Sequence, residues 1–155
     1  MRSKKFKVCM LTHRFVPSIG GVQVATYELA RRLVREGLEV EVHTSRISGC
    51  PDAECLEGIR VIRHRTLFTL FRAQVNPGIA IGLLKHRDAD IVHVAATFPT
   101  VSDLGLLVAR MLRKPAVVAY HLDAVAPGFV GTVLQNAYSQ LFAKWISWFA
   151  TVIVT

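Results

Sequence analysis

Charged residues are scarce in this chain. Only 19% of its 155 residues are Asp, Glu, Lys or Arg, whereas 52% are hydrophobic. This composition excludes an intrinsically disordered chain and predicts strands that are buried on both faces. The charges are unbalanced, with 19 basic against 11 acidic residues and a net charge of +8, which points to anionic ligands. No run of lysine and arginine is interleaved with aromatic residues, so we do not expect a nucleic-acid partner.

Cysteine is also rare, with three residues in the chain. Cys9 falls in an apolar run, where a buried thiol behaves as a small hydrophobic side chain. Cys50 and Cys55 flank a loop and do not have the spacing of metal ligands. An odd count without a metal pattern favours a reduced, cytosolic compartment. We therefore expect no metal ion and no other cofactor.

A long hydrophobic segment is missing as well. The basic start, MRSKK, leads into about six apolar residues, which is too few for a signal peptide. The longest uncharged stretch, 124–143, contains Pro127 and several amide side chains and is a poor membrane span. We therefore expect a cytoplasmic protein, either soluble or peripheral on the cytosolic membrane face. The segment 66–72, TLFTLFR, is the best candidate for contact with an anionic membrane surface.

What the chain does contain is an alternation of strand and helix patterns. Its length suits a single domain. Apolar runs and alternating runs predict strands, and apolar spacings of three or four predict helices. The strands are expected at 6–11, 39–44, 59–63, 90–94, 116–120 and 151–155, and the helices at 22–36, 78–87, 102–113 and 131–149. This order predicts an α/β fold with a doubly wound, mainly parallel sheet of the Rossmann-like type.

Some local details follow from the same patterns. In 39–44 the alternation places the valines inward and Glu41 and His43 outward. The segment 46–58 reads as a polar loop, and 66–72 lies in a connection. Ser102 has the character of an N-cap.

The turn between the first strand and the first helix is the most informative stretch. Pro17 and the pair Gly20-Gly21 stand directly before the helical pattern. The first N–H groups of a helix lack intrahelical partners, and the helix dipole adds positive charge there. Glycine lets a ligand approach because no Cβ stands in the way. The turn predicts a phosphate or sugar-phosphate site; the alternative is a tight turn that binds nothing. Neither GxGxxG nor GK[ST] is present, so it is not a dinucleotide or Walker loop.

Several such features fall at one edge of the expected sheet. In parallel sheets, ligands bind beyond the carboxyl ends of the strands. The Gly20-Gly21 loop, the 95–101 loop and His121 all follow strand ends. The sequence therefore predicts one shared site at this edge.

The segment VCMLTHRFVPSIGGVQ (8–23) resembles the start of the retaining glycosyltransferases of family 4, which have the GT-B fold. Gly-Gly-Val followed by Gln is most similar to the branch that glycosylates phosphatidylinositol. The ending TVIVT looks like the last strand before the crossover to a second domain. The resemblance implies that residues 1–155 form a single N-terminal, acceptor-side domain and that the C-terminal donor-binding domain is absent from this chain.

This resemblance implies a function. A sugar would move from a nucleotide-sugar donor to a phosphoinositol lipid or another glycan acceptor, with retention of configuration and without a required metal. The isolated chain would be inactive. Two alternatives stay open, namely one subunit of a split GT-B enzyme with a partner chain, and a non-catalytic module that binds a phosphorylated or lipid ligand. Apolar surface where a second domain would pack also predicts self-association.

The resemblance also assigns residues to the site. His121 would be the catalytic residue beside the reacting sugar, and Gly20 and Gly21 would admit the donor phosphates. Gln23 matches a position that contacts the inositol acceptor. His93 matches a strand-end histidine of the family and is assigned to acceptor binding, although a structural role fits this residue equally well.

Three more residues are assigned to the acceptor side. Arg14 could bind a phosphate in bidentate fashion, or it could remain a solvated loop residue. His13 precedes it in the same loop. Asp123 follows His121 and either faces the acceptor or caps its loop.

Overall fold

The computed structural model describes residues 5–70, 73–96, 101–120 and 148–154. Within these residues, helices and strands alternate along most of the chain, apart from five consecutive strands between α1 and α2. The elements are β1 (Lys7–Leu11), α1 (Gly21–Arg35), β2 (Glu39–Ser45), β3 (Ala53–Leu56), β4 (Ile59–His64), β5 (Phe68–Leu70), β6 (Ala73–Val75), α2 (Pro77–Lys85), β7 (Ile91–Ala96), α3 (Val101–Met111), β8 (Ala116–Tyr120) and β9 (Val152–Val154). The helix expected at 131–149 lies almost wholly outside the described residues.

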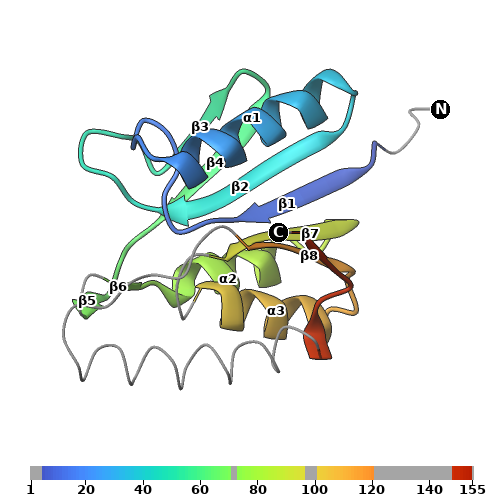
Figure 1. Cartoon of the computed structure of the whole chain (residues 1–155). Helices are drawn as coiled ribbons and strands as arrows, with labels where there is room; N and C mark the ends of the chain where they lie inside the picture. Colours follow the sequence, from blue (N-terminus) through green and yellow to red (C-terminus); the bar gives the residue numbers. More distant parts are fainter. Residues whose placement is uncertain (1–4, 71–72, 97–100, 121–147, 155) are drawn as a thin grey trace.

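A seven-stranded sheet forms the centre of the fold. Its strand order is β3-β4-β2-β1-β7-β8-β9, and β5 pairs with β6 in a separate small sheet. All neighbouring strands of the large sheet run parallel except β3, which is antiparallel to β4. Helix α1 covers one face, and α2 and α3 cover the other (Figure 1). The predicted α/β fold with a doubly wound, mainly parallel sheet is confirmed.

Two segments that were expected to be irregular contain strands. Within 46–58, β3 pairs with β4 so that Leu56 faces Ile59. Glu57 and Gly58 between them both have positive φ, which closes a two-residue hairpin. The strand was missed because it is an edge strand with alternately exposed side chains, so its sequence is polar. The segment 66–72 likewise contains β5, which forms a hairpin with β6.

The helix ends show one expectation confirmed and one corrected. Helix α1 ends at Arg35, within one residue of the predicted end, and Gly37 just after it has a φ of +87°. The N–H of Gly37 donates to Val34 O, and the N–H of Leu38 donates to Leu33 O, which is a Schellman motif. Ser102, by contrast, is not an N-cap, because α3 begins one residue earlier and Ser102 is buried within its first turn.

The core is divided between the two faces of the sheet. Alternate residues of each strand point to opposite faces, so Val8 and Met10 pack under α1 while Cys9 and Leu11 pack under α2 and α3. On the α2 side, Gly105 of α3 approaches closely, since an added Cβ would lie 2.7 Å from Leu11 Cδ1. Both faces of β1 and β2 are therefore covered by helices.

This double coverage corrects the expected orientation in β2. Glu41 and His43 were expected to point outward to solvent, but both are fully buried on the face covered by α2. The alternation in the sequence is real, and it separates two buried faces rather than a buried face from an exposed one.

Glu41 is held in the interior by cationic and histidine partners. Its Oε1 atom lies 2.9 Å from His43 Nε2 and 3.0 Å from His86 Nδ1. Its Oε2 atom lies 3.4 Å from Lys7 Nζ and 3.5 Å from Arg60 Nη1. Burial raises the pKa of Glu41, but the hydrogen bond from His43 and the charges around it outweigh burial, and the pKa falls below its ordinary value. Glu41 is therefore an ionised carboxylate inside the core.

Replacing Glu41 by alanine is expected to lower the free energy of unfolding by about 3 kcal/mol, because the partners of Glu41 lose a buried anion. Urea denaturation at pH 7, followed by circular dichroism, measures the loss. Glu39→Ala is the matched control, since Glu39 lies on the same strand with an exposed side chain 3.9 Å from Lys7, and it should cost less than about 0.5 kcal/mol. Equal losses in the two variants would contradict the role given to Glu41.

Candidate functional site

The carboxyl edge of the sheet carries the loop that leads from β1 to α1. The loop continues the pairing of β1 with β2, since Thr12 N–H donates to His43 O and Ser45 N–H donates to His13 O. It then turns back, and α1 begins at Gly21. Figure 1 shows that the first turn of α1 lies at the end of the sheet to which the arrows of β1 and β2 point. The predicted order of strand, glycine turn and helix N-terminus is confirmed.

The two glycines of this turn differ in what surrounds them. Gly20 has extended backbone, and a Cβ added there would lie 2.3 Å from Gln23 Oε1, because the side chain of Gln23 folds back over Gly20. A Cβ at Gly21 would meet nothing within 4 Å. The space in front of the first helical N–H groups is thus open at Gly21, which is what an approaching anion requires.

A cavity of about 310 Å³ lies beside this turn. Its walls come from the ends of β1 and β2 and are formed by Arg14, Pro17, Ser18, Ser45, Arg46 and Ile47. Two of the lining residues are arginines, and arginine side chains suit a phosphate or another anion. Arg46 is already paired with Asp52 (2.8 Å), whereas Arg14 is exposed at the cavity.

Sequence reasoning identified Arg14 but missed Ser45 and Arg46. Both follow the last apolar positions of β2, and the rule that ligands bind at the carboxyl ends of parallel strands could have found them. Ser45 is fully buried, and its Oγ atom accepts a hydrogen bond from Asn76 Nδ2 at 3.1 Å. It is therefore placed by the start of α2 as well as by β2.

Arg63 connects the loops that flank this cavity. Its side chain is buried, donates to Val16 O at 2.9 Å and Pro51 O at 3.3 Å, and pairs with Glu54. One side chain of β4 thus fixes both the turn before α1 and the loop before β3. A second cavity of about 430 Å³ lies beside these loops, with mostly apolar walls formed by Val16, Pro17, Tyr27, Gly49, Cys50, Pro51, Glu54 and Leu56.

The other residues predicted for the site do not share one location. His13 is half-buried beside Arg14, and burial, aided by the charge of Arg14, lowers its pKa. His93 is buried in the middle of β7, not at the strand end as expected, because β7 continues to Ala96. His121 and Asp123 lie outside the described residues, as does most of the 95–101 loop.

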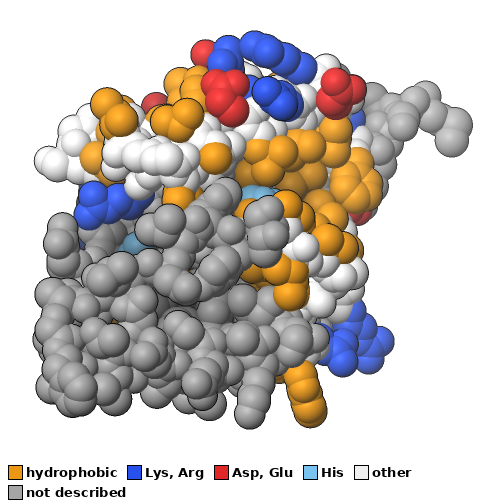
Figure 2. Space-filling view, viewed as in Figure 1, with side chains coloured by type: hydrophobic (Ala, Val, Ile, Leu, Met, Phe, Trp, Pro, Cys, Tyr) orange, Lys and Arg blue, Asp and Glu red, His pale blue; other side chains and the backbone are white. Residues whose placement is uncertain are grey.

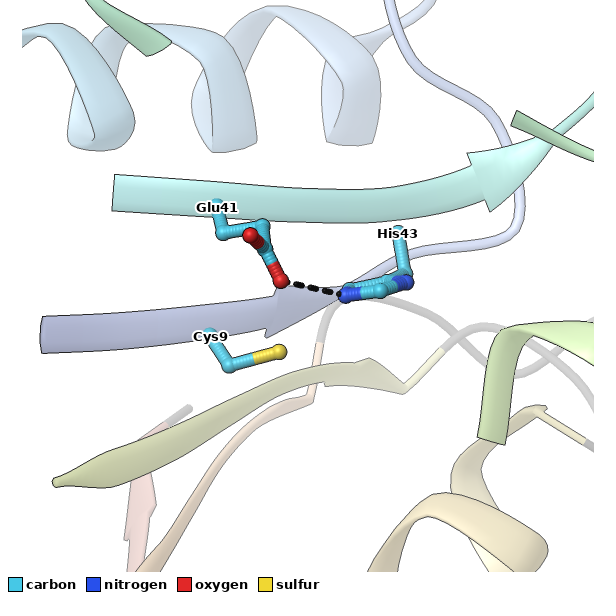
Figure 3. Close-up of side chains that lie close together, drawn as sticks. All are labelled: Cys9, Glu41 and His43. Carbon is cyan, nitrogen blue, oxygen red and sulfur yellow. Dashed lines mark hydrogen bonds and ion pairs between the residues drawn. The ribbon is translucent and has the colours of Figure 1, made fainter. Parts of the chain in front are cut away.

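A separate polar cluster lies in the core between β1, β2 and α2. The ligand atoms of Cys9, Glu41 and His43 all lie within 4.8 Å of one another (Figure 3). Spacing of this kind is compatible with a metal ion, but Lys7 stands 3.4 Å from the carboxylate. Burial also raises the pKa of the Cys9 thiol, which keeps it protonated. Because a protein cation already balances Glu41, we interpret the cluster as a hydrogen-bonded Glu41–His43 pair with the Cys9 thiol packed beside it.

Among the described residues, no helix combines the length and the apolar character needed to cross a membrane.

The fold of this chain is similar to that of two proteins of known structure. The crystal structure of MurG from Acinetobacter baumannii is similar, with a TM-score of 0.52 and 19% identity over 97% of this chain. The crystal structure of Alr3699/HepE from Anabaena, in complex with UDP and glucose, has a TM-score of 0.62 and 15% identity over 96% of this chain. At such low identity these similarities show the fold alone. This chain spans 40% and 37% of the lengths of those two proteins.

The sequence itself gives the family. No curated protein matches it, but the model of Glycosyltransferase Family 4 matches residues 19–155, which is most of the chain. Together with the doubly wound sheet shared with GT-B glycosyltransferase structures, this match shows that the chain belongs to Glycosyltransferase Family 4.

Proposed function

We propose that this chain is the acceptor-side half of a retaining glycosyltransferase. In this proposal a sugar moves from a nucleotide-sugar donor to a phosphoinositol lipid or another glycan. The observation that carries the proposal is the convergence at one sheet edge of the open N-terminus of α1 at Gly21 and the cavity between Arg14 and Arg46. Both features favour phosphate groups, and a reaction of this class has phosphate on the donor and, for a phosphoinositol lipid, on the acceptor as well.

The donor is proposed to lie over the glycine turn. Gly20 and Gly21 would let its diphosphate approach the first N–H groups of α1. His121 would stabilise the charge that develops on the departing phosphate, which is where preorganised donors act most strongly. No metal ion is proposed for this step.

The acceptor is proposed to occupy the neighbouring cavity. Arg14 and Arg46 would hold an acceptor phosphate, and Gln23 would reach the acceptor from the first turn of α1. His13 and Asp123 would complete the acceptor side. His93 would act from beneath the edge as a positioning residue, since it is buried within β7.

A second half is proposed to complete the enzyme. Residues 1–155 would form one domain, and donor binding would need a longer form of the protein or a partner chain. Figure 2 shows hydrophobic side chains at the surface below α1, and all three residues of β9 are about half exposed. Apolar surface of this kind supports packing against a further domain or a second copy.

Sugar transfer by the complete form tests the proposal. The intact mass of the native protein decides whether the longer chain or a two-chain complex is assayed. We expect transfer to phosphatidylinositol in vesicles, with the anomeric configuration retained by NMR. His121→Ala should lower kcat by about 100-fold. Inversion of configuration would refute the retaining mechanism. Binding of inositol phosphates without any transfer by the complete form would favour a binding module instead.

The open space at Gly21 allows a sharper test of donor binding. Gly21→Ala should leave the free energy of unfolding within about 0.5 kcal/mol of the wild-type value, because its Cβ meets no atom. It should lower kcat/KM for the donor by about tenfold, because the methyl group obstructs hydrogen bonds to a charged phosphate. Val24→Ala, an exposed change in the same helix, is the control. Unchanged donor kinetics in Gly21→Ala would place the phosphates elsewhere.

Contact with a membrane is proposed for the β5–β6 hairpin. Leu67 and Phe68 are 67% and 54% exposed, and Arg65 two residues earlier is also exposed. Exposed apolar side chains beside a basic one suit the surface of an anionic bilayer. The hairpin would then bring the carboxyl edge of the sheet towards a lipid acceptor on the cytosolic face.

The double substitution Leu67→Glu and Phe68→Glu should reduce binding to vesicles containing phosphatidylinositol by about tenfold, since apolar burial is lost and negative charge is added. Vesicle co-sedimentation measures the change. Met111→Glu is the matched control, because Met111 is as exposed as Leu67 but lies at the end of α3. Equal reductions in both variants would mean that binding follows net charge, not the hairpin.

A further inference from the structure

Three histidines and one carboxylate form a row of close polar contacts beneath α2. His43 is fully buried, and its Nδ1 atom lies 2.9 Å from His64 Nε2. On its other side, His43 Nε2 lies 2.9 Å from Glu41 Oε1, which also contacts His86 Nδ1 at 3.0 Å. The row extends from His64, the last residue of β4, to His86, the residue after α2.

The row fixes the tautomers of His43 and His64 when the histidines are neutral. Because the carboxylate of Glu41 only accepts, His43 must donate to it from Nε2. His43 Nδ1 is then an acceptor, so His64 must donate from Nε2. The planes of His43 and His64 differ by 14° with centroids 5.1 Å apart. Together with the short N···N distance, this places the rings edge to edge, which is the geometry of an N–H···N hydrogen bond.

Helix α2 lies directly on this pair of rings. A Cβ added at Gly82 would stand 2.4 Å from His43 Nδ1 and 2.8 Å from His64 Nε2. One turn earlier, a Cβ at Gly78 would stand 3.0 Å from His64 Cβ. Two successive turns of α2 therefore pack against the hydrogen-bonded rings of His43 and His64.

The surroundings of the pair are mostly cationic. The charged and titratable groups next to the pair are Glu41, which contacts His43, and Lys85 and His86 at the end of α2, with Cys9 within 4.8 Å of His43. Lys7 and Arg60 contact Glu41 in turn, and Asp88 contacts Lys7. Among them Glu41 is the one anion in contact with a ring of the pair. Added positive charge on both rings is therefore poorly compensated.

The pair can accommodate one added proton but not two. With one, the pair still has one N–H donor and one acceptor nitrogen facing each other between the rings. With two, both rings are cations, and two N–H groups face each other across 2.9 Å. That arrangement has no acceptor between the rings and places two like charges in a buried site.

We propose that the His43–His64 pair is an acid-sensitive latch, which holds α2 on the sheet while the pair carries at most one added proton and releases it when both rings are charged. Release would also free the β5–β6 hairpin, since β6 ends two residues before α2 begins. This proposal does not rest on the proposed sugar transfer.

The direction of the pH dependence follows from the two states. Burial lowers the pKa of His64 from 6.5 to about 4, and the charges of His43, Lys85 and His86 act in the same direction. The unfolded or released state therefore binds the proton more readily than the docked state. The contribution of the latch is complete above pH 6.5 and is lost as the pH falls towards 4.

Hydrogen exchange of the 155-residue chain tests the latch. Mass spectrometry between pH 7.5 and 4 compares amides of α2 with those of α1, which packs on the opposite face and serves as an internal reference. After correction for the chemical exchange rate, exchange in α2 should accelerate by about 10- to 100-fold relative to α1 between pH 6.5 and 4. Parallel loss of protection in both helices would overturn the proposal.

His64→Gln provides the decisive variant, because glutamine can still donate to His43 Nδ1 but does not titrate. Protection of α2 in this variant should stay within about threefold of its neutral value down to pH 4. His13→Gln is the matched control, since it removes another histidine of lowered pKa that lies outside the row, and it should follow the wild type. A His64→Gln curve that matches the wild type would refute the latch.

Two further measurements test the latch if the His64→Gln variant does not fold. Long-range ¹⁵N NMR of the wild type at pH 7.5 should show His43 and His64 protonated at Nε2. Gly82→Ala, which forces the rings apart, should expose α2 already at pH 7.5. A neutral His43 protonated at Nδ1, or a fully protected α2 in Gly82→Ala, would each overturn the proposal.

Discussion

The buried carboxylate of Glu41 is the constraint on which the rest of the structure depends. A charge buried between a sheet and a helix must be paired and hydrogen-bonded, since solvent cannot compensate it. Glu41 meets this requirement with partners from β1, β4 and the segment after α2, namely Lys7, Arg60 and His86, besides its own strand neighbour His43. The contact with His86, the residue after α2, ties the end of that helix to β2.

The carboxyl edge gains its chemistry from parallel strands and from one buried arginine. Parallel pairing places the ends of β1, β2 and β4 side by side, so the residues that follow each strand share one surface. Arg63 then ties the turn before α1 to the loop before β3. The cavity between Arg14 and Arg46 lies among segments held in this way, so its walls are arranged before any ligand arrives.

The sequence was sufficient for the fold class because strand and helix periods alternate clearly, and for the glycine turn because Gly20 and Gly21 stand between a strand and a helix. It was insufficient where burial depends on tertiary neighbours. Alternation in β2 does not reveal that both faces are covered, so Glu41 and His43 were expected at the surface. A polar edge strand such as β3 has no apolar face long enough to detect. The cavity residue Arg46 belongs to a different loop from Arg14, and only the register of β1 with β2 brings the two loops together.

The histidine row and the cavity are parts of one hydrogen-bonded unit. The carbonyl oxygen of His64 accepts from Arg46 N–H at 2.8 Å and from Asn76 Nδ2 at 2.9 Å. The same Asn76 amide donates to Ser45, which lines the cavity. The backbone of His64, whose ring packs against α2, therefore also positions the Arg46 side of the cavity. Because these groups share acceptors and donors, effects of changes at Asn76 or His64 on ligand binding and on the docking of α2 will not be additive, and a double-mutant cycle is needed to separate them.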